Sequence, residues 1–135
     1  MAANTSPIFT VTPLAAWATL TTGTNTYTGT SGTNVVYTAG SAGGYLSSII
    51  CKAAGTNVAS VLRIFINNGS TSGTAANNSL AWEVSLPATT ATAVAATQTV
   101  EFIINKQIPA SYTVIVVLAT TVAAGWQVTG IGGSY

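Results

Sequence analysis

Apolar and polar residues alternate along most of this chain, and that two-residue period constrains its fold more than any other feature. In residues 60–67, Leu62, Ile64 and Ile66 fall on one side of an extended chain and Arg63 on the other. Residues 80–86 repeat the pattern. A period of two belongs to a β-strand with one face on a core, and no segment has the 3.6-residue period of an amphipathic helix. The sequence therefore predicts an all-β protein.

Turn residues divide the alternating segments into short strands. Asn67-Asn68-Gly69 is a strong turn signal, because Asn and Gly tolerate positive φ. Residues 88–96 are rich in Ala and Thr without an apolar stripe, and we expect a loop there. The expected strands are residues 8–12, 17–20, 35–39, 44–53, 60–67, 80–86, 98–105, 112–118 and 125–131.

Eight or nine strands with long connections predict an antiparallel β-sandwich, with a jelly roll as the first expectation and an immunoglobulin-like sandwich as the alternative. We expect one domain over residues 1–135, in which residues 1–20 are either first strands or an extended amino-terminal arm. Pro13 is expected to end the first strand. In residues 44–53, Leu46 and Ile50 are expected on one face and Tyr45, Ile49 and Cys51 on the other.

Only five side chains carry a formal charge, namely Lys52, Arg63, Lys106, Glu83 and Glu101. Nucleic-acid binding depends on clustered Lys and Arg, so three scattered basic residues disfavour it. The strongest apolar run, residues 114–119, is too short for a membrane span, which takes about 20 residues. We expect no nucleic-acid partner and no membrane partner.

The chemistry needed for catalysis or metal binding is scarce. The sequence has no His and no Asp, and Glu83 and Glu101 are its only side-chain carboxylates. A Ser-His-Asp triad cannot be assembled, and zinc and calcium lack their usual ligands. Cys51, the single cysteine, lies in an apolar strand and is expected to be a small buried hydrophobe. We predict a protein that is not an enzyme, with no catalytic, cofactor-binding or metal-binding residues.

Two patterns suggest binding surfaces. Thr22, Thr24, Thr26, Thr28 and Thr30 occupy alternate positions, which on a strand would form a threonine row of the kind that suits ice binding, but Gly23 and Gly29 interrupt it. Of the three tryptophans, Trp82 and Trp126 fall on expected core faces, whereas Trp17 lies between alanines. We therefore expect Trp17 to be the exposed tryptophan.

The net charge of +1 leaves little repulsion between copies. Near-zero charge favours association, and the centres of interfaces are depleted in charged residues. We therefore expect a homo-oligomer.

Residues 63–70, with residues 75–80 and 83–90, resemble small β-rich proteins of tailed-bacteriophage virions. The similarity continues through residues 55–62, 108–112 and 121–126, and covers about residues 45–135. It implies a capsid decoration (cement) protein, a jelly roll that binds the major capsid protein on the outer virion surface and stabilises the head against internal DNA pressure. The resemblance also implies that the homo-oligomer is a trimer. Such a protein is made in the bacterial host cytoplasm. The resemblance carries over no functional residue.

We place the predicted capsid or subunit contact at Ile8, Phe9 and Trp17. The alternative is that Ile8 and Phe9 are core residues of a first strand. A second function also stays open: an adhesion module on a tail or head fibre that binds a bacterial surface glycan through exposed aromatic side chains.

Overall fold

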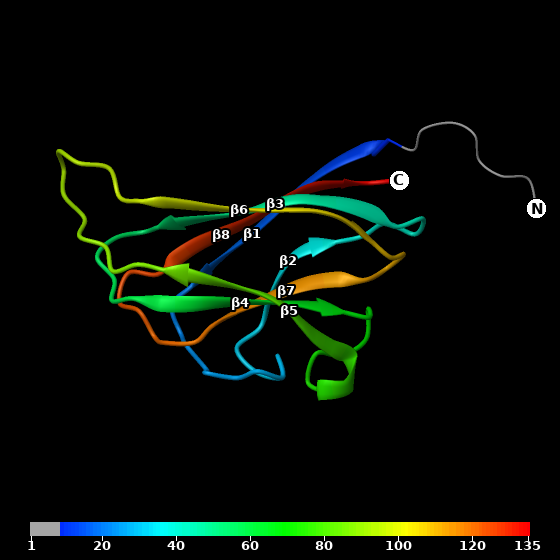
Figure 1. Ribbon diagram of the computed structural model, residues 1–135, viewed down its shortest axis with the longest axis horizontal. Helices are drawn as coiled ribbons and strands as arrows, with labels where there is room; N and C mark the ends of the chain where they lie inside the picture. The colour runs from blue at the N-terminus through cyan, green and yellow to red at the C-terminus, as the bar shows by residue number, and fades with distance from the viewer. Residues whose placement is uncertain (1–8) are drawn as a thin grey trace, which may run out of the picture.

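Two four-stranded antiparallel sheets pack face to face in the computed structural model, which describes residues 9–135 (Figure 1). The strands are β1 (Thr12–Leu20), β2 (Asn34–Thr38), β3 (Gly44–Ala53), β4 (Ser60–Asn67), β5 (Asn78–Leu86), β6 (Thr99–Ile108), β7 (Thr113–Leu118) and β8 (Trp126–Ser134). The first sheet has the order β1-β8-β3-β6, and the second has the order β2-β7-β4-β5. One short 3₁₀ helix, η1 (Ala75–Asn77), precedes β5. The predicted all-β sandwich is confirmed.

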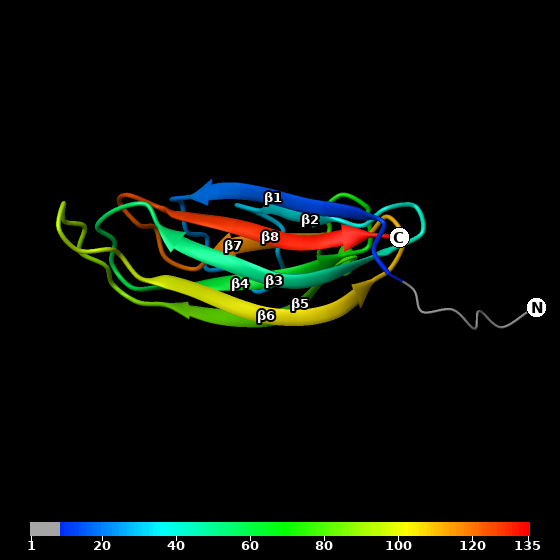
Figure 2. The ribbon, with the colours of Figure 1, turned by 90° about the horizontal axis from the view of Figure 1, so that it is seen from above.

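The strand order is that of a jelly roll. The pairs β4/β5, β3/β6, β2/β7 and β1/β8 nest inside one another along the chain, as if one long hairpin were folded over into two layers. Figure 2 shows β1, β8, β3 and β6 side by side, with the second sheet behind them. The order separates this fold from the immunoglobulin-like alternative, whose sheets combine strands differently.

The core lies between the sheets and is filled by the inward positions of each strand. Trp126 and Tyr37 are its largest fully buried side chains, and Leu46, Ile49, Leu62 and Ile64 are completely buried around them. A second, smaller cluster of Phe65, Ile115 and Val117 lies on the opposite side of the second sheet. Strand β7 is therefore apolar on both faces.

The expectation that Pro13 ends a first strand is wrong. Residues 12–20 form one continuous strand, β1, in which Pro13 lies opposite Gly133. Proline is tolerated because β1 is at the edge of its sheet, where a missing N–H costs no ladder hydrogen bond if it points outward. Residues 12–20 are thus part of the sheet and do not form an extended arm.

The predicted faces of β3 are also wrong. The pairing of β3 shifts register between Leu46 and Ser48 against both of its neighbours, so a β-bulge lies there. A bulge adds one residue and reverses the alternation beyond it. As a result Leu46, Ile49 and Cys51 all face the core, while Ile50 is only half-buried.

The predicted threonine row does not lie on a strand. Apart from one isolated bridge at Gly23, residues 21–33 have no regular secondary structure, and they cross the outer side of the second sheet. We call residues 21–33 the covering segment. Within it, the Thr28 hydroxyl is 2.9 Å from that of Thr26 and 3.1 Å from that of Thr30. The expected loop at residues 88–96 is confirmed.

Candidate interaction surfaces

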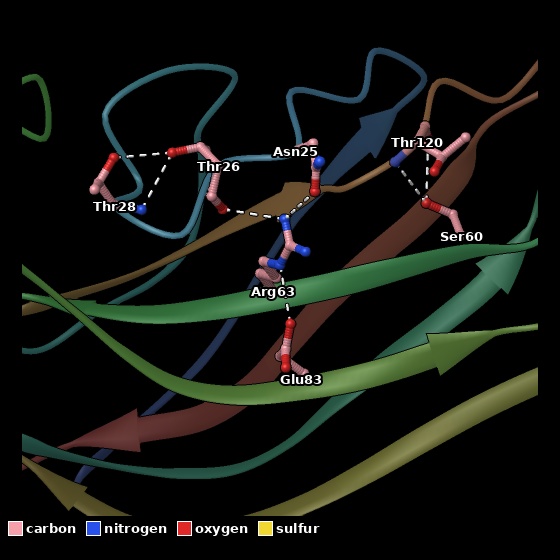
Figure 3. Close-up of polar contacts among 7 residues, drawn as sticks. All are labelled: Asn25, Thr26, Thr28, Ser60, Arg63, Glu83 and Thr120. Carbon is pink, nitrogen blue, oxygen red and sulfur yellow. Dashed lines mark hydrogen bonds and ion pairs between the residues drawn. The ribbon is translucent and has the colours of Figure 1, made fainter.

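The Arg63 side chain links the covering segment to the second sheet through hydrogen bonds (Figure 3). It projects from β4 on the side away from the main core. Its Nε donates to Glu83 Oε1 on β5 at 2.9 Å, and its Nη1 donates to Asn25 Oδ1 at 3.0 Å and to the Thr26 carbonyl at 3.2 Å. The ring of Tyr27 covers the guanidinium, with 3.7 Å from Cζ to the ring centroid. The planar guanidinium suits this use, because its N–H groups point in several fixed directions.

Further hydrogen bonds and packing contacts hold residues 28 and 29 of the covering segment against the second sheet. Asn78 Nδ2 is 3.0 Å from the carbonyls of both Thr28 and Gly29, and it also donates to the Ser72 carbonyl. Gly29 has positive φ and lies against the Phe65 ring, where a Cβ would be 3.1 Å from the ring atoms. The chain itself therefore closes the outer side of the second sheet around Phe65.

Within residues 9–135, no segment covers the outer side of the first sheet, and a band of apolar side chains crosses it. One cross-strand row contains Trp17, Thr129, Ile50 and Glu101, and the next contains Ala15, Ile131, Ser48 and Ile103. Trp17 is 70% exposed and Ile103 is 58% exposed. We call Ala15, Trp17, Ile50, Ile103 and Ile131 the outer band.

The three residues predicted for the capsid or subunit contact fall in different places. Ile8 lies outside the described residues. Phe9 is 76% exposed, so it is not a core residue of a first strand. Trp17 is the exposed tryptophan, whereas Trp126 is buried and Trp82 packs beside Phe102 at the edge of the core. Phe9 and Trp17 are both accessible to a partner.

Phe9 belongs to a shallow hollow at one end of the first sheet. Thr10, Tyr45 and Tyr135 line it with Phe9, and its volume is about 290 Å³. Three aromatic rings and three hydroxyls around one depression resemble the lining of a sugar site, in which rings stack on the sugar and hydroxyls fix its orientation.

The two side-chain carboxylates of this protein lie on different sheets. Glu83 binds Arg63 on the second sheet, while Glu101 lies on the outer side of the first. Within residues 9–135, no cluster of three potential metal-ligating side chains occurs. Cys51 is fully buried, and the loss of solvation raises the pKa of its thiol from 9.0 to about 12. In the described part of the chain, no helix is long and apolar enough to span a bilayer.

Two buried asparagines, Asn57 and Asn67, bind other segments of the chain and were not among the predicted site residues. Asn57 Oδ1 accepts from the amides of Ala124 and Gly125, both at 2.9 Å, and its Nδ2 donates to the Gly125 carbonyl. Asn67 Nδ2 donates to Asn78 Oδ1 at 2.8 Å across β4 and β5. Asparagine is common in exposed turns, so only the burial of these residues distinguishes them.

Comparisons with protein-family models, with curated proteins and with solved structures find no match to this chain.

Proposed function

We propose that this chain is a non-enzymatic structural protein of a tailed-bacteriophage virion, a capsid decoration protein that binds the major capsid protein on the outer surface of the head. It would be made in the host cytoplasm and add to the mechanical strength of the head. The observation that carries the proposal is the contrast between the two sheets. The covering segment closes the outer side of the second sheet, whereas the described residues leave the outer band of the first sheet exposed.

The outer band has the character of an interface centre. Its exposed members are an aromatic ring and aliphatic side chains, and Glu101 and Lys52 are the charged residues in adjoining positions. Interface centres are depleted in charge and enriched in aromatic residues, and a buried Trp often carries much of the binding energy. Phe9 extends the accessible aromatic surface at the end of the same sheet.

Many copies on one particle would make a modest contact sufficient. Repeated attachment multiplies weak binding, and three copies related by a closed rotation would leave no unpaired interface to grow into a fibre. A trimer therefore remains the proposed arrangement on the head. The proposed function needs no catalytic group, cofactor or metal.

Co-sedimentation of purified protein with phage heads that lack it tests this proposal. We expect saturable binding, and we expect treated heads to retain their DNA at higher temperatures than untreated heads. Trp17→Ser and Ile103→Ser should each weaken binding about tenfold or more, because each removes exposed apolar surface from the outer band.

Val94→Ser is the matched control. Val94 is 96% exposed but lies in the loop between β5 and β6, away from the outer band, so its loss should leave head binding unchanged. Failure of the wild-type protein to bind heads, or equal losses in all three variants, would contradict the proposed role.

The aromatic hollow favours glycan binding as a second candidate function. A virion adhesion module would use Phe9, Tyr45 and Tyr135 to stack on a bacterial surface sugar. A glycan array would then give specific binding that Tyr45→Ala abolishes and Trp17→Ser leaves intact. In the head-binding assay we expect the reverse: Trp17→Ser should weaken binding more than Tyr45→Ala does. The two assays together therefore distinguish the two functions.

A further inference from the structure

The free edge of β1 differs from the other three sheet edges. An exposed edge strand offers unpaired N–H and C=O groups to any other extended chain, and proteins usually protect such edges with charges, bulges or short strands. β6 carries Glu101 and Lys106 and pairs through a bulge. β5 carries Glu83 and also pairs through a bulge, and β2 has only 5 residues and a register shift.

β1 has none of these three devices, and its one proline, Pro13, which can also protect an edge, lies next to its first residue. It is 9 residues long, contains no charged residue, and pairs with β8 without a register shift. Beside it, a groove of about 130 Å³ between β1 and β2 is lined by Leu14, Ala16, Val36 and Tyr37, among others. Most residues of β1 are exposed, including Ala15, Trp17 and Thr19, so the described chain leaves this edge accessible.

Pro13 indicates which residues point toward the free edge. Proline has no N–H to donate, so in an edge strand its nitrogen faces away from the neighbouring strand. Residues two apart on a strand point their backbone groups to the same side. Ala15, Trp17 and Thr19 therefore present their N–H and C=O groups outward, while Leu14, Ala16 and Ala18 pair with β8.

We propose that β1 is a self-association edge: two copies of this chain pair their β1 strands antiparallel about a two-fold axis and join their first sheets into one eight-stranded sheet. With the axis at Trp17, residues 14–20 of one copy lie opposite residues 20–14 of the other. Pro13 then falls beyond the paired region. The ladder is roughly 23 Å long and contains about six hydrogen bonds.

A second copy suits this edge better than another partner for two reasons. An uncharged strand brings no like charges together when it pairs with itself, and the net charge of +1 adds little repulsion. The pairing also places the exposed Trp17 ring next to its counterpart on the same side of the joined sheet, where both lose contact with water. The two outer bands become one continuous surface.

This contact goes beyond the proposed capsid role and is tested without virus particles. Sedimentation of the purified protein should give an even number of copies, either two or, where trimers pair, six. Ala15→Pro removes one outward N–H donor from each copy, or two of the roughly six hydrogen bonds, and should weaken the association about tenfold or more. Should Ala15→Pro fail to fold, Ala15→Lys places a charged side chain on the β1 edge, as Glu101 and Lys106 do on β6. This variant should also weaken the association.

Disulfide formation tests the two-fold register. Opposite residues in a hydrogen-bonded antiparallel pair have Cα atoms about 5.5 Å apart, within the range of a disulfide. Trp17→Cys should therefore give a covalent dimer on mild oxidation. Ile103→Cys is the matched control, since Ile103 is similarly exposed on the protected edge strand β6, and it should remain uncrosslinked. Buried Cys51 should not take part.

A wild-type protein that sediments as a monomer or as a simple trimer would overturn the proposal. So would a folded Ala15→Pro variant with unchanged mass, or equal crosslinking at positions 17 and 103. A simple trimer would leave the capsid proposal standing, so the two proposals fail separately.

Discussion

Arg63 carries the only buried charge among the five charged side chains of this protein. Its side chain is 5% exposed, whereas that of Glu83 is 45% exposed, so solvent screens part of the ion pair. The bonds to Asn25 and to the Thr26 carbonyl matter more, since they tie an irregular segment to a strand 37 residues or more away in sequence. The main effect of the Arg63 guanidinium is therefore to position the covering segment on the second sheet.

Replacing Arg63 should loosen the covering segment. Arg63→Met retains much of the side-chain volume but leaves Glu83, Asn25 and Thr26 without their donor, which should lower the free energy of unfolding by about 2 kcal/mol. Urea denaturation measures the change. Lys106→Met, on the exposed part of β6, should change it by less than about 0.5 kcal/mol. Equal effects at the two positions would argue against the anchoring role of Arg63.

Cys51 should make stability fall at alkaline pH. Its thiol has a pKa of about 12 in the fold because burial disfavours the thiolate, against 9.0 without that burial. Above pH 9 the unfolded chain loses this proton while the folded chain keeps it, so unfolding becomes easier until about pH 12. The free energy of unfolding of the wild type relative to Cys51→Ala should be constant below pH 9. Above that pH it should fall by at most about 1.4 kcal/mol per pH unit.

At the scale of the element, the covering segment and the strand edges decide which surfaces remain available. The segment joins β1 to β2, and in doing so it hides Phe65, Ile115 and Val117, which would otherwise form an exposed apolar patch on the second sheet. Its amides are satisfied partly by β7 and the following turn, since Thr24 donates to the Leu118 carbonyl and Asn25 to that of Ala119. The segment is thus a third layer built without regular structure.

Gly23 controls how closely this segment approaches the sheet. A Cβ at position 23 would lie 2.6 Å from the Thr120 Cα and would also collide with neighbouring backbone atoms, which cannot give way as a side chain can. Gly23→Ala should therefore lower the free energy of unfolding by about 1–3 kcal/mol. Denaturant titration measures this loss, and hydrogen exchange at Thr24 and Asn25 should accelerate. At Gly73 a Cβ would meet only the Thr71 hydroxyl at 3.8 Å, so Gly73→Ala is the control and should be nearly neutral.

At the scale of the whole molecule, the jelly roll joins the beginning of the described chain to its end. β1 pairs with β8, and β2 pairs with β7, so the outermost pairs of the roll connect the most distant strands. The core holds few polar groups, and a single ion pair links the described side chains. Apolar burial and backbone hydrogen bonds therefore dominate both folding and association.

Salt should consequently have little effect on this protein. Added NaCl screens interactions between exposed charges, but here few such charges exist. Neither the urea midpoint nor the sedimentation mass should decrease between low and moderately high NaCl concentration. A loss of the oligomer on addition of salt would show that charge pairs hold the copies together, contrary to the apolar contact proposed for β1.

The sequence could predict the class of fold because strand alternation is a local property. Each alternating segment reports its own inward and outward faces, and eight of them with turns between them restrict the chain to a sandwich or barrel. Burial of Trp126 follows from the same alternation. Burial of Cys51 was predicted from its apolar surroundings, and exposure of Trp17 from its position between alanines. The bulge in β3 was not predicted because it depends on pairing with β6 and β8. The residues of a strand do not by themselves specify which strands pair with it.

Alternation and composition by themselves determined that this protein is a β-sandwich with few charged side chains. Only the tertiary structure decided which of its surfaces are free. In the sequence, nothing distinguishes Arg63, Asn25 and Asn78 from other polar residues, and only the fold brings them together around Phe65. Likewise, only the sheet topology places β1 at an edge. Contacts between residues far apart in sequence determine both outcomes, and no local period encodes such contacts.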